Sequence, residues 1–261
     1  MKLPARILIV TLFILSAALL GDCTRHPPLE EMDVQEAFRY LEQLYHSGKY
    51  QRAAEGLNFF TLTYSGDALI DSAQFLLAMT HLKLKEYLLA ADAFDELVRR
   101  FPSSNLVPEA MYMVGECYWN LSPHYALDQK YTLKAIDALQ TFIDYYPDHR
   151  DRVESAQELI FKCRSKLAHK EYSNGLIYLK MKDYRAAEIY FSAVLDEYYD
   201  TEWAARSSYQ LGVCHARNGD VDQAVAAFED FLAKYPSHPW RGRVEEALMQ
   251  ARAARGEGDG N

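Results

Sequence analysis

Residues that could carry out chemistry are few and scattered along this chain of 261 residues. Its eight histidines form no H-E-x-x-H pair, and the chain has no Walker A loop, nucleophile elbow or dinucleotide-binding glycine motif. His81 and His215 stand where a helical repeat has an aromatic residue facing its neighbour, so we interpret them as packing residues. Because no acid, base and nucleophile converge, the sequence predicts a protein that is not an enzyme and that holds no metal or cofactor.

A short apolar segment at the start of the chain predicts export from the cytoplasm. Lys2 and Arg6 precede fourteen largely apolar residues, 7–20. As a helix these residues would extend about 21 Å, which is shorter than the ~30 Å hydrocarbon core of a membrane. We therefore expect residues 1–22 to be a signal peptide.

Cys23 follows this segment directly and is the candidate lipidation residue. The tripeptide Gly21-Asp22-Cys23 is similar to the lipobox of bacterial lipoproteins, in which a peptidase cleaves before a cysteine that becomes lipidated. Asp22 departs from that motif, which has a small residue at this position. Three outcomes stay open: a lipid anchor on Cys23, soluble export after cleavage, or an uncleaved anchor. We expect the lipid anchor, with residues 23–32 as a lipidated tether.

The other cysteines, Cys117, Cys163 and Cys214, are widely spaced and contain no C-x-x-C pair. A free cysteine behaves as a small buried hydrophobic residue. We therefore expect these three side chains to pack in the interior and not to form a disulfide framework.

The elements that must position all of these residues are helices, because an apolar stripe with helical spacing recurs five times. In each copy, an alanine is followed by an apolar residue four positions later and by another seven positions later. The copies are Ala53/Leu57/Phe60, Ala90/Phe94/Leu97, Ala135/Leu139/Phe142, Ala187/Phe191/Val194 and Ala224/Phe228/Phe231. Such a stripe is typical of the second helix of a tetratricopeptide repeat.

Glycines and prolines mark the limits of the repeats. Gly115, Gly175 and Gly212 precede the alanine of their repeats and allow the first helix to approach the second closely. Prolines then stop three of the second helices, at Pro102, Pro147 and Pro236. Two gaps between alanines are longer than the others: one holds an insertion within residues 120–130, which we expect to be a loop, and one holds an additional helix over roughly 152–170.

The predicted fold is therefore all-α: a right-handed tetratricopeptide-repeat solenoid of five helix pairs with an additional long linking helix. Residues 33–149 are predicted to form repeats one to three, and residues 150–237 the linking helix and repeats four and five. Residues 238–261 are predicted to be a C-terminal capping helix and a disordered tail. The formal charge of −9, without a basic stripe, argues against a nucleic-acid partner.

An aromatic residue occupies the same place in the first helix of every repeat. The five residues are Phe38, Phe75, Tyr112, Tyr172 and Tyr209. Two interpretations stay open: these rings pack within their helix pairs, or they line a concave groove that captures an extended or helical peptide. In the second interpretation Phe38, Tyr45, Phe75, Met79 and Leu82 form one apolar surface on the front repeats.

Two stretches go beyond a generic repeat and resemble the BamD family, the lipoprotein component of the bacterial β-barrel assembly machinery. One runs Leu121-Ser122-Pro123, Leu127-Asp128-Gln129, Thr132, Ala135-Ile136, Gln140, Phe142-Ile143 and Tyr146-Pro147. The other runs Leu167-Ala168, Lys170-Glu171, Tyr178, Lys180, Tyr184, Ala186-Ala187, Val194-Leu195 and Asp200-Thr201. The resemblance covers about residues 33–237.

This resemblance implies a lipid-anchored scaffold on the periplasmic face of the outer membrane. Its front repeats would receive the C-terminal signal of unfolded outer-membrane proteins. Its rear repeats would dock the periplasmic domain of the central barrel protein, beside other assembly lipoproteins, and we place Tyr172, Tyr190 and Tyr209 in that partner interface.

The chain departs from the family pattern at two positions. Tyr199 replaces the proline of a Tyr-Pro-Asp-Thr turn, and Tyr190 stands where many members carry an arginine that contacts the barrel protein. The alternative function is that of another periplasmic repeat adaptor, coordinating cell division or cell-wall synthesis. The identity of the proteins that co-purify with the chain would distinguish barrel assembly from this alternative function.

Overall fold

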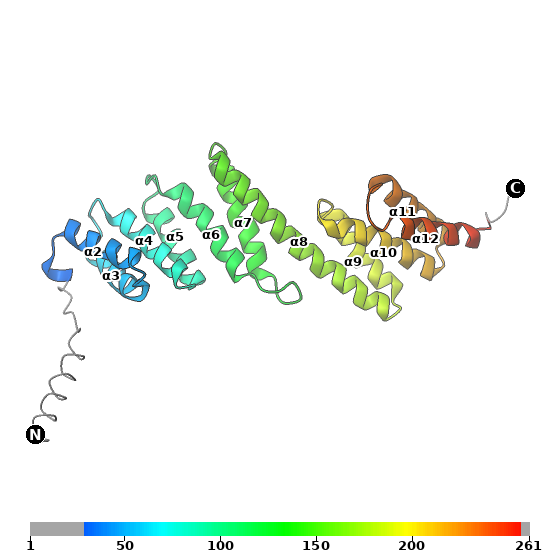
Figure 1. The fold of residues 1–261 in the computed structure, drawn as a ribbon, viewed down its shortest axis with the longest axis horizontal. Helices are drawn as coiled ribbons and strands as arrows, with labels where there is room; N and C mark the ends of the chain where they lie inside the picture. Colours follow the sequence, from blue (N-terminus) through cyan, green and yellow to red (C-terminus); the bar gives the residue numbers. More distant parts are fainter. Residues whose placement is uncertain (1–28, 257–261) are drawn as a thin grey trace, which may run out of the picture. The chain divides into compact units, whose positions relative to one another are not determined.

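The computed structural model describes residues 29–256, which form α-helices joined by short connections and contain no β-strand. The predicted signal peptide and Cys23 lie outside the described residues. After the 3-10 helix η1 (Leu29–Glu31) come α2 (Val34–His46), α3 (Tyr50–Thr63), α4 (Ile70–Lys83), α5 (Tyr87–Arg100), α6 (Val107–Leu121), α7 (Lys130–Tyr145), α8 (Arg150–Lys180), α9 (Tyr184–Glu197), α10 (Glu202–Asn218), α11 (Val221–Lys234) and α12 (Arg241–Ala254) (Figure 1). The predicted all-α tetratricopeptide-repeat fold is confirmed.

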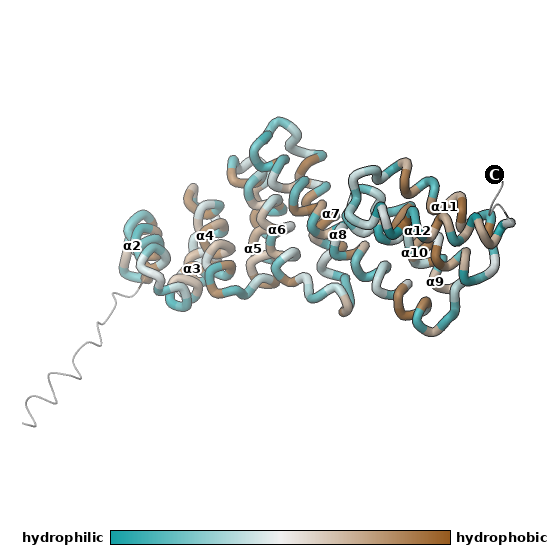
Figure 2. The backbone as a smooth tube through the Cα atoms, turned by 45° about the vertical axis from the view of Figure 1, so that its right-hand side comes forward, coloured by the Kyte–Doolittle hydropathy of each residue, from teal (hydrophilic) through white to brown (hydrophobic). Residues whose placement is uncertain are grey.

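The chain divides into two compact units, one ending at Ile70 and one beginning at Asp71. The first contains the helix pair α2/α3, and the second contains the remaining repeats and α12. Apolar segments recur in successive helices along the chain and do not form one long run (Figure 2). Accordingly, none of the described helices combines the length and the apolarity that crossing a membrane requires.

The predicted apolar stripe forms the interior of every helix pair. Each of its residues, from Ala53 in the first repeat to Phe231 in the last, is at most 1% exposed. An alanine in this stripe brings the two helices close together, and the larger residues one and two turns later fill the space between them.

A small residue of one helix meets a large residue of the other at the centre of a pair. A Cβ atom added to Gly212 of α10 would lie 2.5 Å from the Phe228 ring of α11, and Gly175 and Phe191 stand in the same relation. In the first repeat the roles are exchanged, because Leu41 of α2 occupies the space above Gly56 of α3. The contact is therefore kept even where the small residue changes helix.

Four short turns between paired helices use the left-handed backbone conformation. Gly48 and Gly219 adopt φ values of 75° and 89°, which glycine tolerates without strain. Lys85 and Lys182 adopt φ values of 61° and 63° at the matching turns. A lysine is uncommon in this conformation, because its Cβ atom crowds the backbone there.

Helix α8 joins the third repeat to the fourth. The sequence predicted a linking helix over roughly 152–170, and the structure extends it without interruption through the first helix of repeat four. Its first part packs against α7 through Ala156 and Leu159, and its last part packs against α9 through Ala168 and Tyr172 (Figure 1). One helix therefore contributes to two separate apolar cores.

We predict that Gly212→Ala lowers the free energy of unfolding by about 1–3 kcal/mol, because the added methyl group meets a ring that is only 1% exposed and cannot move aside. The matched control is Gly242→Ala in α12, where a Cβ atom would meet nothing within 4 Å. We expect that substitution to leave stability unchanged or to raise it by up to about 1 kcal/mol. Urea unfolding followed by circular dichroism measures both, and equal midpoints for the two variants would contradict the packing account.

Candidate functional site

The predicted front surface draws residues from both compact units. In the first unit, Phe38 is 9% exposed and its ring lies 5.9 Å from that of Phe60. Tyr45, in the last turn of α2, is half-buried and meets Tyr50 edge to face at 5.6 Å. Burial, and secondarily Tyr50, raises the pKa of the Tyr45 hydroxyl, so this side chain presents a neutral, partly apolar ring.

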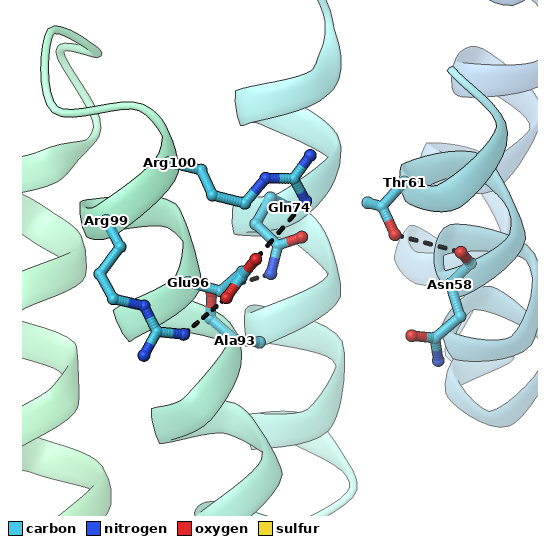
Figure 3. A network of polar contacts seen from close by, with 7 residues as sticks. All are labelled: Asn58, Thr61, Gln74, Ala93, Glu96, Arg99 and Arg100. Atoms are coloured by element: carbon cyan, nitrogen blue, oxygen red, sulfur yellow. Dashed lines mark hydrogen bonds and ion pairs between the residues drawn. The ribbon is translucent and has the colours of Figure 1, made fainter. Parts of the chain in front are cut away.

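In the second unit, α4 carries Phe75, Met79 and Leu82, all half-buried against the core shared by α5 and α6. The register of α4 is fixed by Gln74, which is 5% exposed and donates its side-chain amide to the backbone oxygen of Ala93 at 2.9 Å (Figure 3). The partly exposed side chains of α4 are thus held on a rigid element, as a binding surface requires.

The five equivalent aromatic residues all contact a phenylalanine of their own helix pair. Ring centroids are 5.9 Å apart for Phe38 and Phe60, 5.5 Å for Phe75 and Phe94, 5.9 Å for Tyr112 and Phe142, 5.8 Å for Tyr172 and Phe191, and 6.0 Å for Tyr209 and Phe228. Packing within the pair is therefore part of the role of each ring. Phe75 and Tyr209 differ from the others in remaining half-exposed, which leaves area for a ligand.

The three residues predicted for the rear interface occupy different environments. Tyr172 is 7% exposed and lies beneath Trp203, with ring centroids 5.3 Å apart. Tyr190 is half-buried and stacks on Tyr178 at 5.2 Å with nearly parallel rings. A hydrogen bond with Tyr178 raises the pKa of Tyr190.

Tyr209 contacts the C-terminal helix region. Its ring meets Trp240 edge to face at 5.6 Å, and the Arg243 guanidinium lies 5.3 Å from the ring centroid. The same tyrosine lines a cavity of about 430 Å³ among α10, α11 and α12.

The rear repeats also expose apolar side chains that sequence reasoning missed. Ile177 of α8 is 58% exposed, Met181 at the C-cap of α8 is 68% exposed, and Ile189 of α9 is 69% exposed. Ile177 has the same place in its repeat as Cys117 and Cys214, which are fully buried. The difference arises because α7 packs along the earlier part of α8 and does not cover Ile177. The long gap between the alanines of repeats three and four was the feature of the sequence that could have indicated this exposed position.

The turn after α9 is fixed by an ion pair whose carboxylate, Asp200, belongs to the second stretch that resembles the BamD family. Arg164 of α8 donates two hydrogen bonds to the Asp200 carboxylate, at 2.6 and 3.1 Å, and another to the Glu197 backbone oxygen at 2.8 Å. These bonds hold the pKa of Asp200 below its usual value. The pair therefore stabilises the turn at neutral pH and loses that contribution as the pH falls through the pKa of Asp200.

The insertion before α7 is a loop, as predicted, and it is tied to α8 and to itself. Gln129 is 4% exposed and donates to the backbone oxygens of His124, Tyr125 and Leu127 at 2.9, 3.2 and 3.1 Å. Lys170 of α8 donates to the Leu127 backbone oxygen at 3.0 Å. The loop is thus a fixed part of the surface.

The described histidines and cysteines also agree with packing roles. His81 Nδ1 lies 2.8 Å from a carboxylate oxygen of Glu86, and His215 Nδ1 lies 3.2 Å from a carboxylate oxygen of Glu188. Cys117, Cys163 and Cys214 are free and fully buried. Burial raises the pKa of each thiol to about 12, so none is a nucleophile at neutral pH.

Helix pairs that repeat along the chain, each with its own apolar interior, place this protein in the class of helical-repeat proteins. Residues 30–209 match the YfiO family, described as outer membrane lipoprotein, and residues 206–238 match the tetratricopeptide repeat. The chain therefore belongs to this outer membrane lipoprotein family, which confirms the resemblance found in the sequence.

Named relatives are similar over different lengths. The outer membrane protein assembly factor BamD of Rickettsia prowazekii is 24% identical over 228 residues, which cover 85% of this chain and 88% of the relative. BamD of Helicobacter pylori is 31% identical over 84 residues, which cover 32% of this chain and 38% of the relative. A solved tetratricopeptide-repeat protein from Bacteroides fragilis has a TM-score of 0.46 at 19% identity. The match covers 85% of this chain and 98% of that protein's chain.

We predict that Cys117, Cys163 and Cys214 do not react with iodoacetamide in the folded protein at pH 8. With a pKa of about 12, roughly one thiol in ten thousand is a thiolate, and each is also closed off from solvent. Mass spectrometry after labelling should show these three thiols modified only when guanidinium is present. Rapid labelling of any of them without denaturant would contradict their burial.

Proposed function

We propose that this chain is a non-enzymatic adaptor lipoprotein of outer-membrane β-barrel assembly. The observation that carries the proposal is the family match over residues 30–209, supported by relatives that are named as outer membrane protein assembly factors. The buried, unreactive cysteines and the packed histidines are consistent with a scaffold that binds and does not catalyse.

The anchor in this proposal is a lipid on Cys23, which would hold the chain at the periplasmic face of the outer membrane. The family description as a lipoprotein supports this assignment. The iodoacetamide experiment tests it as well, because an unmodified Cys23 in the mature protein would react without denaturant. A lipidated cysteine has no free thiol and stays unlabelled.

In the front repeats, the proposed ligand is the C-terminal segment of an unfolded outer-membrane protein. Tyr45 of α2 and Phe75, Met79 and Leu82 of α4 are held by packing and still keep exposed area. Barrel-protein C-termini typically carry alternating aromatic residues. Burying one large side chain contributes roughly 1.5–3 kcal/mol before ordering costs, so a few such contacts support a usable affinity.

In the rear repeats, the proposed ligand is the periplasmic domain of the central barrel protein, beside further assembly lipoproteins in the same complex. Tyr190, which stands in place of an arginine, is committed to its stack with Tyr178. We infer that this chain makes an apolar contact there instead of an ion pair, using Ile177, Met181 and Ile189. Tyr172 supports the surface from beneath Trp203, and Tyr209 fixes the Trp240 region.

We predict that Tyr45→Ala and Phe75→Ala each weaken binding of a barrel-protein C-terminal peptide by about tenfold or more, because each removes an aromatic contact. The measurement is a fluorescence-anisotropy titration, with circular dichroism to verify that helicity is kept. Tyr209→Ala is the matched control, since Tyr209 also packs on a phenylalanine of its own pair but lies in the rear repeats. Equal peptide affinity for wild type and the Tyr45/Phe75 double variant would contradict the proposal, because the two rings would then only pack within the protein.

A further inference from the structure

A cavity of about 560 Å³ lies where the insertion loop, α8 and the start of α10 meet, and none of the exposed apolar residues proposed for the rear interface lines it. Its walls are largely aromatic: Trp119 from α6, Tyr125 from the loop, Phe161 from α8 and Trp203 from α10. Phe161 is 47% exposed although it is large and apolar. The cavity therefore offers ring surface that no residue of the described chain covers completely.

The aromatic wall is held in one arrangement. The His169 ring stacks between Tyr125 at 3.5 Å and Trp203 at 3.9 Å. Trp203 also donates its indole N–H to Ser165 Oγ at 3.2 Å. Because loop, α8 and α10 are fixed to each other by this stack, the cavity is formed before any ligand arrives, which lowers the ordering cost of binding.

A cation without a carboxylate partner faces the cavity. The Lys166 ammonium donates to Ser122 Oγ at 2.7 Å and lies 4.0 Å from the centroid of the Trp119 ring. A further, longer contact of 3.4 Å reaches the Ser122 backbone oxygen. Among residues 29–256, Lys166 forms no ion pair, and burial lowers its pKa. An ammonium has three N–H donors, so one is left for a ligand.

The charge around the cavity selects for an anion. Lys162 lies one turn before Lys166 on α8, lines the same cavity and pairs with Glu158 at 3.7 Å on the exposed face of the helix. The lining carboxylate, Glu202, lies 3.7 Å from Arg206 and so has a cationic partner of its own. Since Lys162 and Glu202 each have a partner of opposite charge, Lys166 is the charge at this aromatic cavity that is left for a ligand.

We propose that this cavity binds an extended peptide segment of a partner protein that carries a carboxylate side chain and, two residues away on the same face, an aromatic one. The carboxylate would accept from Lys166 and Lys162, and the aromatic side chain would lie against Phe161 and Trp203. A charge-assisted hydrogen bond in a partly dehydrated site is stronger than one in water, and ring contacts add to it. This site goes beyond the proposed function, which does not require it.

The test is a fluorescence-anisotropy titration of the full-length protein in detergent with a labelled, amidated peptide of sequence Gly-Ser-Glu-Ser-Phe-Gly, whose glutamate and phenylalanine share one face of an extended chain. We expect saturable binding. A peptide with glutamine for glutamate should bind about tenfold more weakly, and one with alanine for phenylalanine should show a similar loss. Free phenylacetate in excess should not displace the peptide, because a small carboxylate lacks the backbone contacts of a peptide.

The protein variants are chosen to spare the fold. Lys162→Glu and Phe161→Ala change exposed residues and should weaken binding of the glutamate peptide by about tenfold and fivefold. Lys180→Glu, a charge reversal at an exposed position at the far end of the same helix, is the matched control and should leave the affinity unchanged.

Absence of saturable binding, equal affinity for the glutamine peptide, or equal affinity of Lys162→Glu and wild type would each overturn the proposal. Loss of front-repeat peptide binding in the Tyr45/Phe75 variant would not affect this result, so the two proposals fail separately.

Discussion

The close contact between a small residue on one helix and a large apolar residue on its partner is the interaction on which each repeat depends. Gly212 under Phe228 and Gly175 under Phe191 show it with the glycine on the first helix, and Gly56 under Leu41 shows it with the glycine on the second. The large residues are almost completely inaccessible to solvent. Because repeats are stabilised chiefly by their neighbours, the orientation of each pair also sets the surface that the next pair can bury.

Regular stacking buries the first helix of a repeat on two sides, and α8 interrupts this pattern. Its early turns belong to the core of α5, α6 and α7, whereas its late turns belong to the core with α9. As a result, Ile177 in the last turns of α8 and Met181 at its C-cap are left exposed. The insertion loop also packs on a face of α8, where Lys170 donates to the Leu127 backbone oxygen. The exposed residues proposed for the rear interface and the aromatic cavity therefore lie where the repeat is irregular.

The regular part of the fold could be predicted from the sequence because it depends on short-range spacing. The alanine stripe and the glycines identified all five pairs, and the linking helix was found from its apolar spacing. Its continuity with repeat four was missed, although no glycine or proline interrupts residues 167–172. The burial of Tyr172 could not be predicted, because the ring that covers it, Trp203, comes from α10, and their contact depends on tertiary packing. The same holds for the cavity, whose walls come from α6, the loop, α8 and α10.

The central claim, that the chain is an adaptor for outer-membrane barrel assembly with its partner surface on the rear repeats, is tested most directly by affinity purification from its own membranes. The account predicts that an outer-membrane barrel protein with periplasmic domains co-purifies with the tagged chain. It also predicts that Ile189→Asp, at a residue 69% exposed on α9, reduces the recovered amount severalfold, whereas Leu62→Asp, at a residue 82% exposed on α3, does not. Recovery of a cell-division or cell-wall complex without any barrel protein would contradict the account.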